Sequence, residues 1–234
     1  MKEHRRIVLM ITASAIAVPG LVTVSNVRAN VVAGSIARVS GVASVKAKDG
    51  KSREAKTKDA VHVEEIIITE ADGQVLIRMN DKSSLLIRPK STVVIEAFQF
   101  ENKPDDRSST SVTAGAIRAV SGQIAREKPA NVKYSAGTAT IGIRGTDIEV
   151  AIIGEGQQDR SGIYHFVYAG STEMRLDTGE VVQVEKELTG FSPAMLQPGE
   201  PRLQILRDRP AFLQSSGFDV LMQQLTNPRI PMIR

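Results

Sequence analysis

Side chains that commonly do chemistry are few in this sequence. It holds three histidines and no cysteine, so thiolate nucleophiles, thiolate metal sites and disulfides are excluded. His62 and Glu64 share one face of a predicted strand and could hold a metal ion, but two ligands at this spacing often occur by chance. His165 alternates with Ile163 and Val167, which predicts a histidine of the core or of a sheet face. We therefore predict neither a metal site nor a cofactor.

Motifs that assemble an active site are also missing from the sequence. It has no Gly-x-Ser-x-Gly nucleophile elbow and no glycine-rich phosphate loop ending in Gly-Lys-Ser/Thr. The adjacent carboxylates Glu64-Glu65 and Asp105-Asp106 lie in or beside polar segments, whereas a glycosidase needs two carboxylates on opposite sides of a cleft. The sequence thus predicts a non-enzymatic protein without catalytic residues.

The formal charge of +4 overstates the basic character of the folded protein, because part of it lies in a predicted leader. Without residues 1–29, 26 basic and 25 acidic residues remain. A nearly neutral chain has no strong electrostatic reason to bind nucleic acid. The basic side chains of residues 46–58 alternate with acidic ones, which indicates a mixed-charge loop and not a nucleic-acid patch.

The first 29 residues follow the pattern of a secretory signal peptide. A basic start (Met1–Arg6) precedes an apolar run (Ile7–Val18) that ends at Pro19-Gly20, and small residues stand at Val27 and Ala29. We predict cleavage after Ala29 and a periplasmic or secreted protein with no stable membrane span. The alternative is an N-terminal anchor in the inner membrane, because residues 7–24 lack charge and approach the length of a span.

Alternating apolar and polar residues dominate the rest of the chain. Turn signals such as Asp49-Gly50 and Asp72-Gly73 separate short runs, which predicts an all-β domain with the architecture of a twisted multi-strand β-solenoid or a two-sheet sandwich. Specific expectations are a charged loop over 51–59, one strand over 61–69, two strands within 138–153 on either side of Arg144-Gly145, and strands at 163–168, 172–177 and 181–185.

Helical spacing is found only near the C-terminus. Phe218, Leu221, Met222 and Leu225 follow the spacing i, i+3, i+4, i+7, which is typical of one face of an α-helix. We expect a short helix at about 215–225 within a tail of residues 200–234.

One segment is more specific than the alternation. Residues 137–148 read Gly-Thr-Ala-Thr-Ile-Gly-Ile-Arg-Gly-Thr-Asp-Ile. This run resembles the most distinctive signature of the FecR-like domain family, an apolar strand that ends in Gly-(Val/Ile)-Arg-Gly-Thr. The segments 34–46, 80–91 and 115–122 resemble other segments of the family in the family's order, although Lys82 replaces a usual glycine. The resemblance covers residues 34–199 and implies one FecR-type β domain.

The best-known members of that family are transmembrane regulators whose cytoplasmic segment holds a sigma factor. Only about five residues precede the apolar run here, so we do not expect this role to carry over. The resemblance implies a stand-alone exported FecR domain, without the cytoplasmic anti-sigma segment, that binds a partner outside the cytoplasm.

The candidate site is the signature itself, which comprises Gly142, Ile143, Arg144, Gly145, Thr146 and Asp147. Glycines inside a strand mark bulges or close backbone approach, and a guanidinium offers five donors in a rigid fork. We expect Arg144 to bind loop carbonyls and a carboxylate, with Asp147 the nearest in sequence, and the Thr146 hydroxyl to cap the turn. This structural role is favoured; contact with an anion or a partner is the alternative.

Three functions remain open. The leading hypothesis is a non-enzymatic periplasmic domain that binds a protein of the cell envelope, in signalling or assembly, by strand addition to an open sheet edge. The alternative is a protein that binds or processes cell-wall or surface polysaccharide, although three tyrosines and no tryptophan offer few faces on which sugars could stack. The third hypothesis is a subunit of a β-rich assembly.

Overall fold

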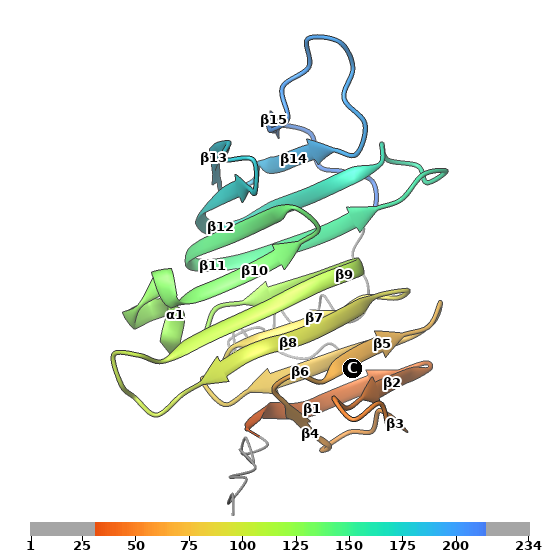
Figure 1. Cartoon of the computed structure of the whole chain (residues 1–234), viewed down its shortest axis with the longest axis vertical. Helices are drawn as coiled ribbons and strands as arrows, with labels where there is room; N and C mark the ends of the chain where they lie inside the picture. The colour runs from red at the N-terminus through yellow and green to blue at the C-terminus, as the bar shows by residue number, and fades with distance from the viewer. Residues whose placement is uncertain (1–30, 214–234) are drawn as a thin grey trace, which may run out of the picture.

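The computed structural model describes residues 31–213, which form a stack of β-strands along one long axis (Figure 1). The predicted signal peptide and the predicted helix at 215–225 lie outside the described residues. Two short helices, α1 (Gln123–Glu127) and the 3-10 helix η1 (Pro129–Asn131), connect β9 to β10, and no described helix has the length and apolar character needed to cross a bilayer. The strands are β1 Val32–Ser40, β2 Ala43–Lys46, β3 Ser52–Glu54, β4 Ala60–His62, β5 Ile66–Thr69, β6 Gln74–Met79, β7 Ser84–Ile87, β8 Thr92–Gln99, β9 Arg107–Val120, β10 Val132–Ala136, β11 Ala139–Ile153, β12 Gly162–Leu176, β13 Val181–Glu185, β14 Thr189–Pro193 and β15 Gln204–Leu206.

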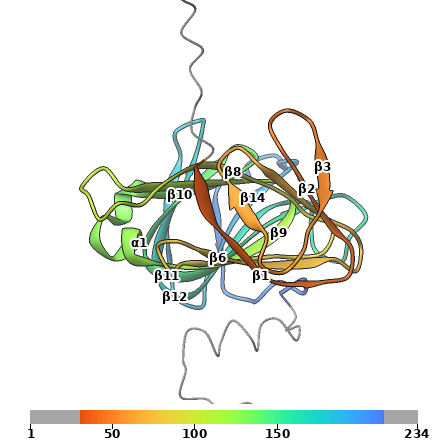
Figure 2. The ribbon, with the colours of Figure 1, turned by 90° about the horizontal axis from the view of Figure 1, so that it is seen from below.

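The strands belong to one hydrogen-bonded sheet that folds over into two layers. Layer A contains, in order, β4, β1, β6, β7, the second halves of β9 and β11, the first half of β12, β14 and β15. Layer B contains β3, β2, β5, β8, the first half of β9, β10, the first half of β11, the second half of β12 and β13. Viewed along the long axis, β8 and β10 lie on one side and β1 and β6 on the other (Figure 2). The all-β prediction is confirmed. The strands stack along one axis, as in the predicted β-solenoid, and form two facing layers, as in the predicted sandwich.

The main hydrophobic core fills the space between the two layers. Every second side chain of a strand points inward, so that Val75 and Ile77 of layer A and Val93 and Ile95 of layer B are fully buried in the same cluster. β-Branched side chains of this kind pack well on a pleated surface. Each such burial contributes about 1.5–3 kcal/mol, so aliphatic packing holds the layers together.

Three long strands pass from one layer to the other, and each bends at a glycine. β9 bends at Gly115, β11 at Gly145 and β12 at Gly170, with φ angles of +72°, +62° and +79°. These angles lie in the left-handed region, which glycine adopts without a steric penalty. Because each of these strands contributes to both layers, the three bends join the layers into one body.

Several predicted boundaries differ from the structure. The single strand expected over 61–69 is two strands, β4 and β5, because the chain turns at Glu64 with a φ of +67°. The loop expected over 51–59 contains β3, and β11 and β12 continue through the points where breaks were expected. The sheet extends beyond residue 199, since β15 pairs with β14. Helix α1 is too short to give a periodic pattern in the sequence.

His165 lies in the core, as predicted. It is fully buried in β12, and its Nε2 lies 2.6 Å from the Oγ1 of Thr172. Burial lowers the pKa of His165 to about 3, because the charged imidazolium would lose its hydration. The histidine is therefore neutral in the folded protein at ordinary pH.

Alanine substitutions at Gly145 and Gly170 should show how much of the loss in stability comes from backbone strain at a bend and how much from close packing. A Cβ at Gly170 would lie 2.6 Å from the carbonyl oxygen of Gly145, whereas a Cβ at Gly145 would meet no atom within 4 Å. We expect Gly145→Ala to lower the free energy of unfolding by about 1 kcal/mol and Gly170→Ala by about 2–4 kcal/mol, since the second adds overpacking to backbone strain. Urea denaturation measures both losses, and equal losses would contradict a tight approach at Gly170.

Acid should destabilise the protein through His165. Its folded pKa lies below the unfolded value of about 6.5, so the unfolded chain binds a proton that the folded chain excludes, and stability falls as the pH drops from about 6.5 towards 3. His165→Gln removes this titration and keeps an amide near Thr172. Between pH 7 and pH 4, we expect the unfolding free energy of the variant to gain about 3 kcal/mol relative to that of the parent protein. A difference that does not change with pH would contradict a neutral buried histidine.

Candidate functional site

The signature residues 142–147 form the bend of β11. The pairing register between β11 and β12 shifts between Arg144 and Asp147, so the strand bulges at Gly145 as expected. Thr146 is buried; its N–H donates to the Ser121 Oγ at 2.8 Å, and its carbonyl accepts from the Ser121 N–H at 2.9 Å. The bend is thus fastened to the end of β9.

Asp147 binds Arg118 and not Arg144, so the predicted contact between Arg144 and Asp147 is wrong. The Nε and a terminal nitrogen of Arg118 donate to the two carboxylate oxygens at 3.0 and 2.8 Å, and the side chains are 4% and 15% exposed. The reason lies in the bulge. It leaves Arg144 in layer B, whereas Asp147 begins the part of β11 that pairs with β9 in layer A.

A second two-pronged ion pair lies beside the first. Arg88 donates to both carboxylate oxygens of Glu149 at 2.9 and 3.0 Å, and the Glu149 side chain is 1% exposed. The Tyr168 hydroxyl donates to Glu149 at 2.8 Å, and the Arg118 guanidinium lies 3.9 Å from the centroid of the Tyr168 ring. Burial and the nearby carboxylate raise the pKa of Tyr168, so its hydroxyl stays protonated. We call Arg88, Arg118, Asp147, Glu149 and Tyr168 the ionic cluster.

Residues 207–213 cover part of the outer face of layer A beside the ionic cluster. Arg209 donates to the Tyr168 hydroxyl at 2.9 Å. The backbone N–H groups of Ala211 and Phe212 donate to the carboxylate of Asp159 at 3.1 and 2.9 Å. The first part of the predicted tail therefore belongs to the folded body.

Sequence analysis misses most of the ionic cluster. Arg88 and Arg118 lie in the segments that carried the family resemblance, and each is a single charge in an apolar run, as Glu149 is in β11. A charge in such a run must find a partner when it is buried, so the signal for a buried ion pair is present. The partners cannot be assigned from it, because they depend on which strands lie side by side.

Arg144 is exposed on the outer face of layer B. Its side chain makes no hydrogen bond or ion pair with any residue in the described range 31–213. Lys133 of β10 is also exposed and stands opposite Gly142, so it lies on the same face, diagonal to Arg144. Ser171 stands opposite Arg144 on β12 and is too short to mask the guanidinium. This face therefore presents two unpaired cations. Glu173, opposite Gly142, lies on the same face but binds Arg175 and Gln183, and the exposed Glu185 stands beyond Ser171.

A groove of about 960 Å³ lies beside β8 near the β1 end of the stack. Each of the four glutamates that line this groove binds another side chain, so the groove presents no free carboxylate. The pairs are Glu64 with Lys48, Glu65 with Arg53, Glu96 with Ser109 and Glu101 with Lys103.

His62 and Glu64, the two residues considered for a metal ion, each contact a different side chain. Glu64 binds Lys48, and the Nδ1 of His62 lies 3.5 Å from the carboxylate of Glu65. Across residues 31–213, no three potential metal-binding side chains gather in one place.

The three tyrosines offer no open aromatic face. Tyr134 and Tyr164 are 6% and 4% exposed, and the ring of Tyr168 is covered by Arg118. Sugar rings stack on exposed aromatic surfaces, so the tyrosines give the carbohydrate hypothesis no support.

The sequence profile of the FecR protein family matches residues 65–173. The chain carries a FecR domain. The match starts just before β5 and ends within β12, so the FecR domain contains the whole ionic cluster and the exposed Arg144. Strands β1–β4 and β13–β15 lie outside the matched residues, yet they continue the same sheet.

Comparisons with other proteins give matches of low identity. Two crystal structures of a candidate anti-sigma factor from Parabacteroides distasonis are each 10% identical to this chain with TM-scores of 0.44; the matches cover 60% and 59% of this chain and 58% and 57% of those chains. The chain thus spans less than two thirds of their length. A cell surface anchoring domain is 26% identical over 26% of this chain and 80% of its own, with a TM-score of 0.26. No curated protein sequence matches.

The FecR domain should need Arg118 for stability but not Arg144. Arg118→Ala leaves the carboxylate of Asp147 in the ionic cluster without its partner, so we expect the free energy of unfolding to fall by about 3–5 kcal/mol. Arg144→Ala removes an exposed, unpaired side chain and should change it by less than about 0.5 kcal/mol. Urea denaturation of the two variants tests this contrast. A large loss in Arg144→Ala would restore a structural role to Arg144, and a small loss in Arg118→Ala would show that the ionic cluster adds little stability.

Proposed function

We propose that this FecR-domain protein is exported to the cell envelope, where it binds a protein partner and catalyses no reaction. Export rests on the secretory pattern of residues 1–29. The binding role rests on the FecR domain, whose family relation suggests envelope signalling or assembly as the setting.

The observation that carries the proposal is the exposed position of Arg144 within the signature. Three neighbours of Arg144 stabilise the bend of β11. Gly145 has the left-handed backbone angle, Thr146 binds Ser121, and Asp147 binds Arg118. Arg144 stands among them but has no such task, and its guanidinium faces solvent. The family's most distinctive segment therefore offers a free cation at a rigid point of the fold.

The chemistry of Arg144 favours a carboxylate of a partner protein. A guanidinium binds a carboxylate through two parallel hydrogen bonds, which fixes orientation as well as distance. The bend that holds Arg144 is fastened through Thr146 to β9, so little backbone must be ordered when a partner binds. Lys133 on the same face adds a second positive charge, and we propose an acidic segment of an envelope protein as the partner.

Site-specific crosslinking in the cell envelope tests this proposal. A photo-crosslinking residue at Ser171, which stands opposite Arg144 on β12, should capture one dominant protein in the native host, and Arg144→Ala should reduce that product at least tenfold while the fold stays intact. The same residue at Glu155, on the exposed loop between β11 and β12, is the matched control and should not capture it. A product insensitive to Arg144→Ala would contradict the proposed site, and a protease-resistant polymer in place of a protein would favour the polysaccharide hypothesis.

A further inference from the structure

Large exposed apolar side chains gather at the two ends of the stack. We call residues 31–62 the first end and residues 177–206 the last end; Figure 1 shows β1–β4 and β13–β15 at opposite extremes of the long axis. In the described chain, the exposed members are Val31, Val32 and Val42 at the first end, and Val181, Met195, Leu196 and Ile205 at the last end. The sides of the stack carry none among the described residues. Apolar side chains that gather in this way mark contact surfaces.

Both ends also present strands with an open edge. At the first end, β3 pairs only with β2 and β4 only with β1; at the last end, β13 pairs only with β12 and β15 only with β14. Each end therefore has one open edge from layer A and one from layer B within the described fold. Such edges have unpaired backbone donors and acceptors and accept further strands.

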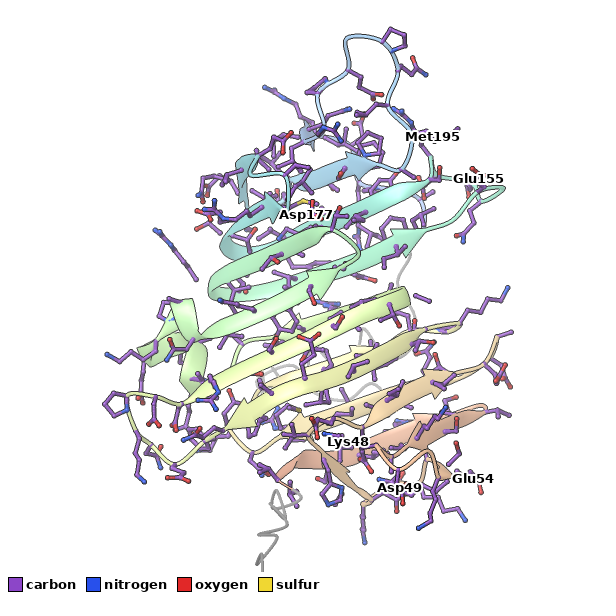
Figure 3. All side chains as sticks on the ribbon, viewed as in Figure 1. Lys48, Asp49, Glu54, Glu155, Asp177 and Met195 are labelled. Atoms are coloured by element: carbon purple, nitrogen blue, oxygen red, sulfur yellow. The ribbon has the colours of Figure 1, made fainter. Side chains whose placement is uncertain are left out.

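The two ends carry opposite charge. Residues 31–62 contain seven basic and three acidic side chains, a net charge of +4, which Glu64 and Glu65, the partners of Lys48 and Arg53, lower to +2. Residues 177–206 contain two basic and five acidic side chains, a net charge of −3, which Arg160, the partner of Glu200, changes to −2. Figure 3 shows Lys48 at one end and Asp177 towards the other. Opposite charge favours contact between unlike ends, and equal charge disfavours contact between like ends.

We propose that copies of this chain associate end to end, with the first end of one copy against the last end of the next. The open edges of β13 and β15 then meet those of β3 and β4, which continues layers B and A from copy to copy. A contact between two different surfaces does not close on itself in a dimer, so it can extend into a short filament. This association uses the ends and goes beyond the proposed partner site at Arg144.

Charge reversal at one end at a time provides the test. Lys51→Glu with Lys56→Glu changes the charge of the first end from +2 to −2; these side chains are 86% and 68% exposed. Glu185→Lys with Glu187→Lys changes the charge of the last end from −2 to +2, and both side chains are exposed. Arg126→Glu with Lys128→Glu, two exposed basic side chains at α1 and away from both ends, is the control with the same change in charge as the first variant. All proteins are produced from the full-length sequence, and circular dichroism checks their sheet content.

Sedimentation velocity over a wide range of protein concentration measures the association. We expect the parent protein and the control to grow in mass with concentration, and 0.5 M salt to reduce this growth because it screens exposed charges. Each end variant alone should associate at least tenfold more weakly. Mixed with each other, the two end variants should associate again in a one-to-one ratio, since the intact +2 end of one meets the intact −2 end of the other.

The mixing result separates this proposal from a loss of folding, because misfolded variants would not recover a defined complex. A parent protein that keeps the mass of one chain at every concentration would overturn the proposal. So would end variants that associate as strongly as the parent, or a mixture of the two that stays monomeric. Binding of the envelope partner through Arg144 is unaffected by any of these outcomes, since crosslinking from Ser171 reports on it separately.

Discussion

The two-layered architecture depends on three left-handed glycine bends, because each bend allows one strand to serve both layers. Without the turns at Gly115, Gly145 and Gly170, the strands β9, β11 and β12 would extend a single sheet, and the aliphatic core would have no second wall. The constraint is strictest at Gly115, where a Cβ would lie 2.3 Å from the Oγ of Ser91, and it also holds at Gly170, where a Cβ would lie 2.6 Å from the carbonyl oxygen of Gly145. The left-handed backbone conformation of these three glycines thus determines where the core of the whole domain can form.

The ionic cluster lies beside one of these bends. Burying charged groups is costly, and the cost is recovered only when the geometry is good and the remaining polar atoms are satisfied. Arg118 and Arg88 meet this condition by binding both oxygens of Asp147 and Glu149, and Tyr168 adds a further donor. The cluster connects the chain just after β7 with β9, β11 and β12 across layer A, so it fixes the relative positions of strands that are far apart in sequence.

The surfaces of the molecule differ in what they leave available. The outer face of layer A carries the ionic cluster and is partly covered by residues 207–213. The outer face of layer B is polar and presents Arg144 without a partner among the described residues. The two ends present open strand edges, exposed apolar side chains and opposite charge. We therefore assign partner binding to layer B and self-association to the ends.

The sequence by itself determined the all-β class, the relation to FecR domains, the buried histidine and the bend at Gly145, because alternation, glycine placement and a lone core histidine are local signals. It did not determine that β11 and β12 continue through their glycines, since a bend and a break have the same residue pattern. Only the tertiary structure decided that Asp147 binds Arg118 and that Arg144 is left exposed. That choice depends on which strands lie side by side and on a one-residue bulge that moves a side chain to another layer, and neither is encoded within a single segment.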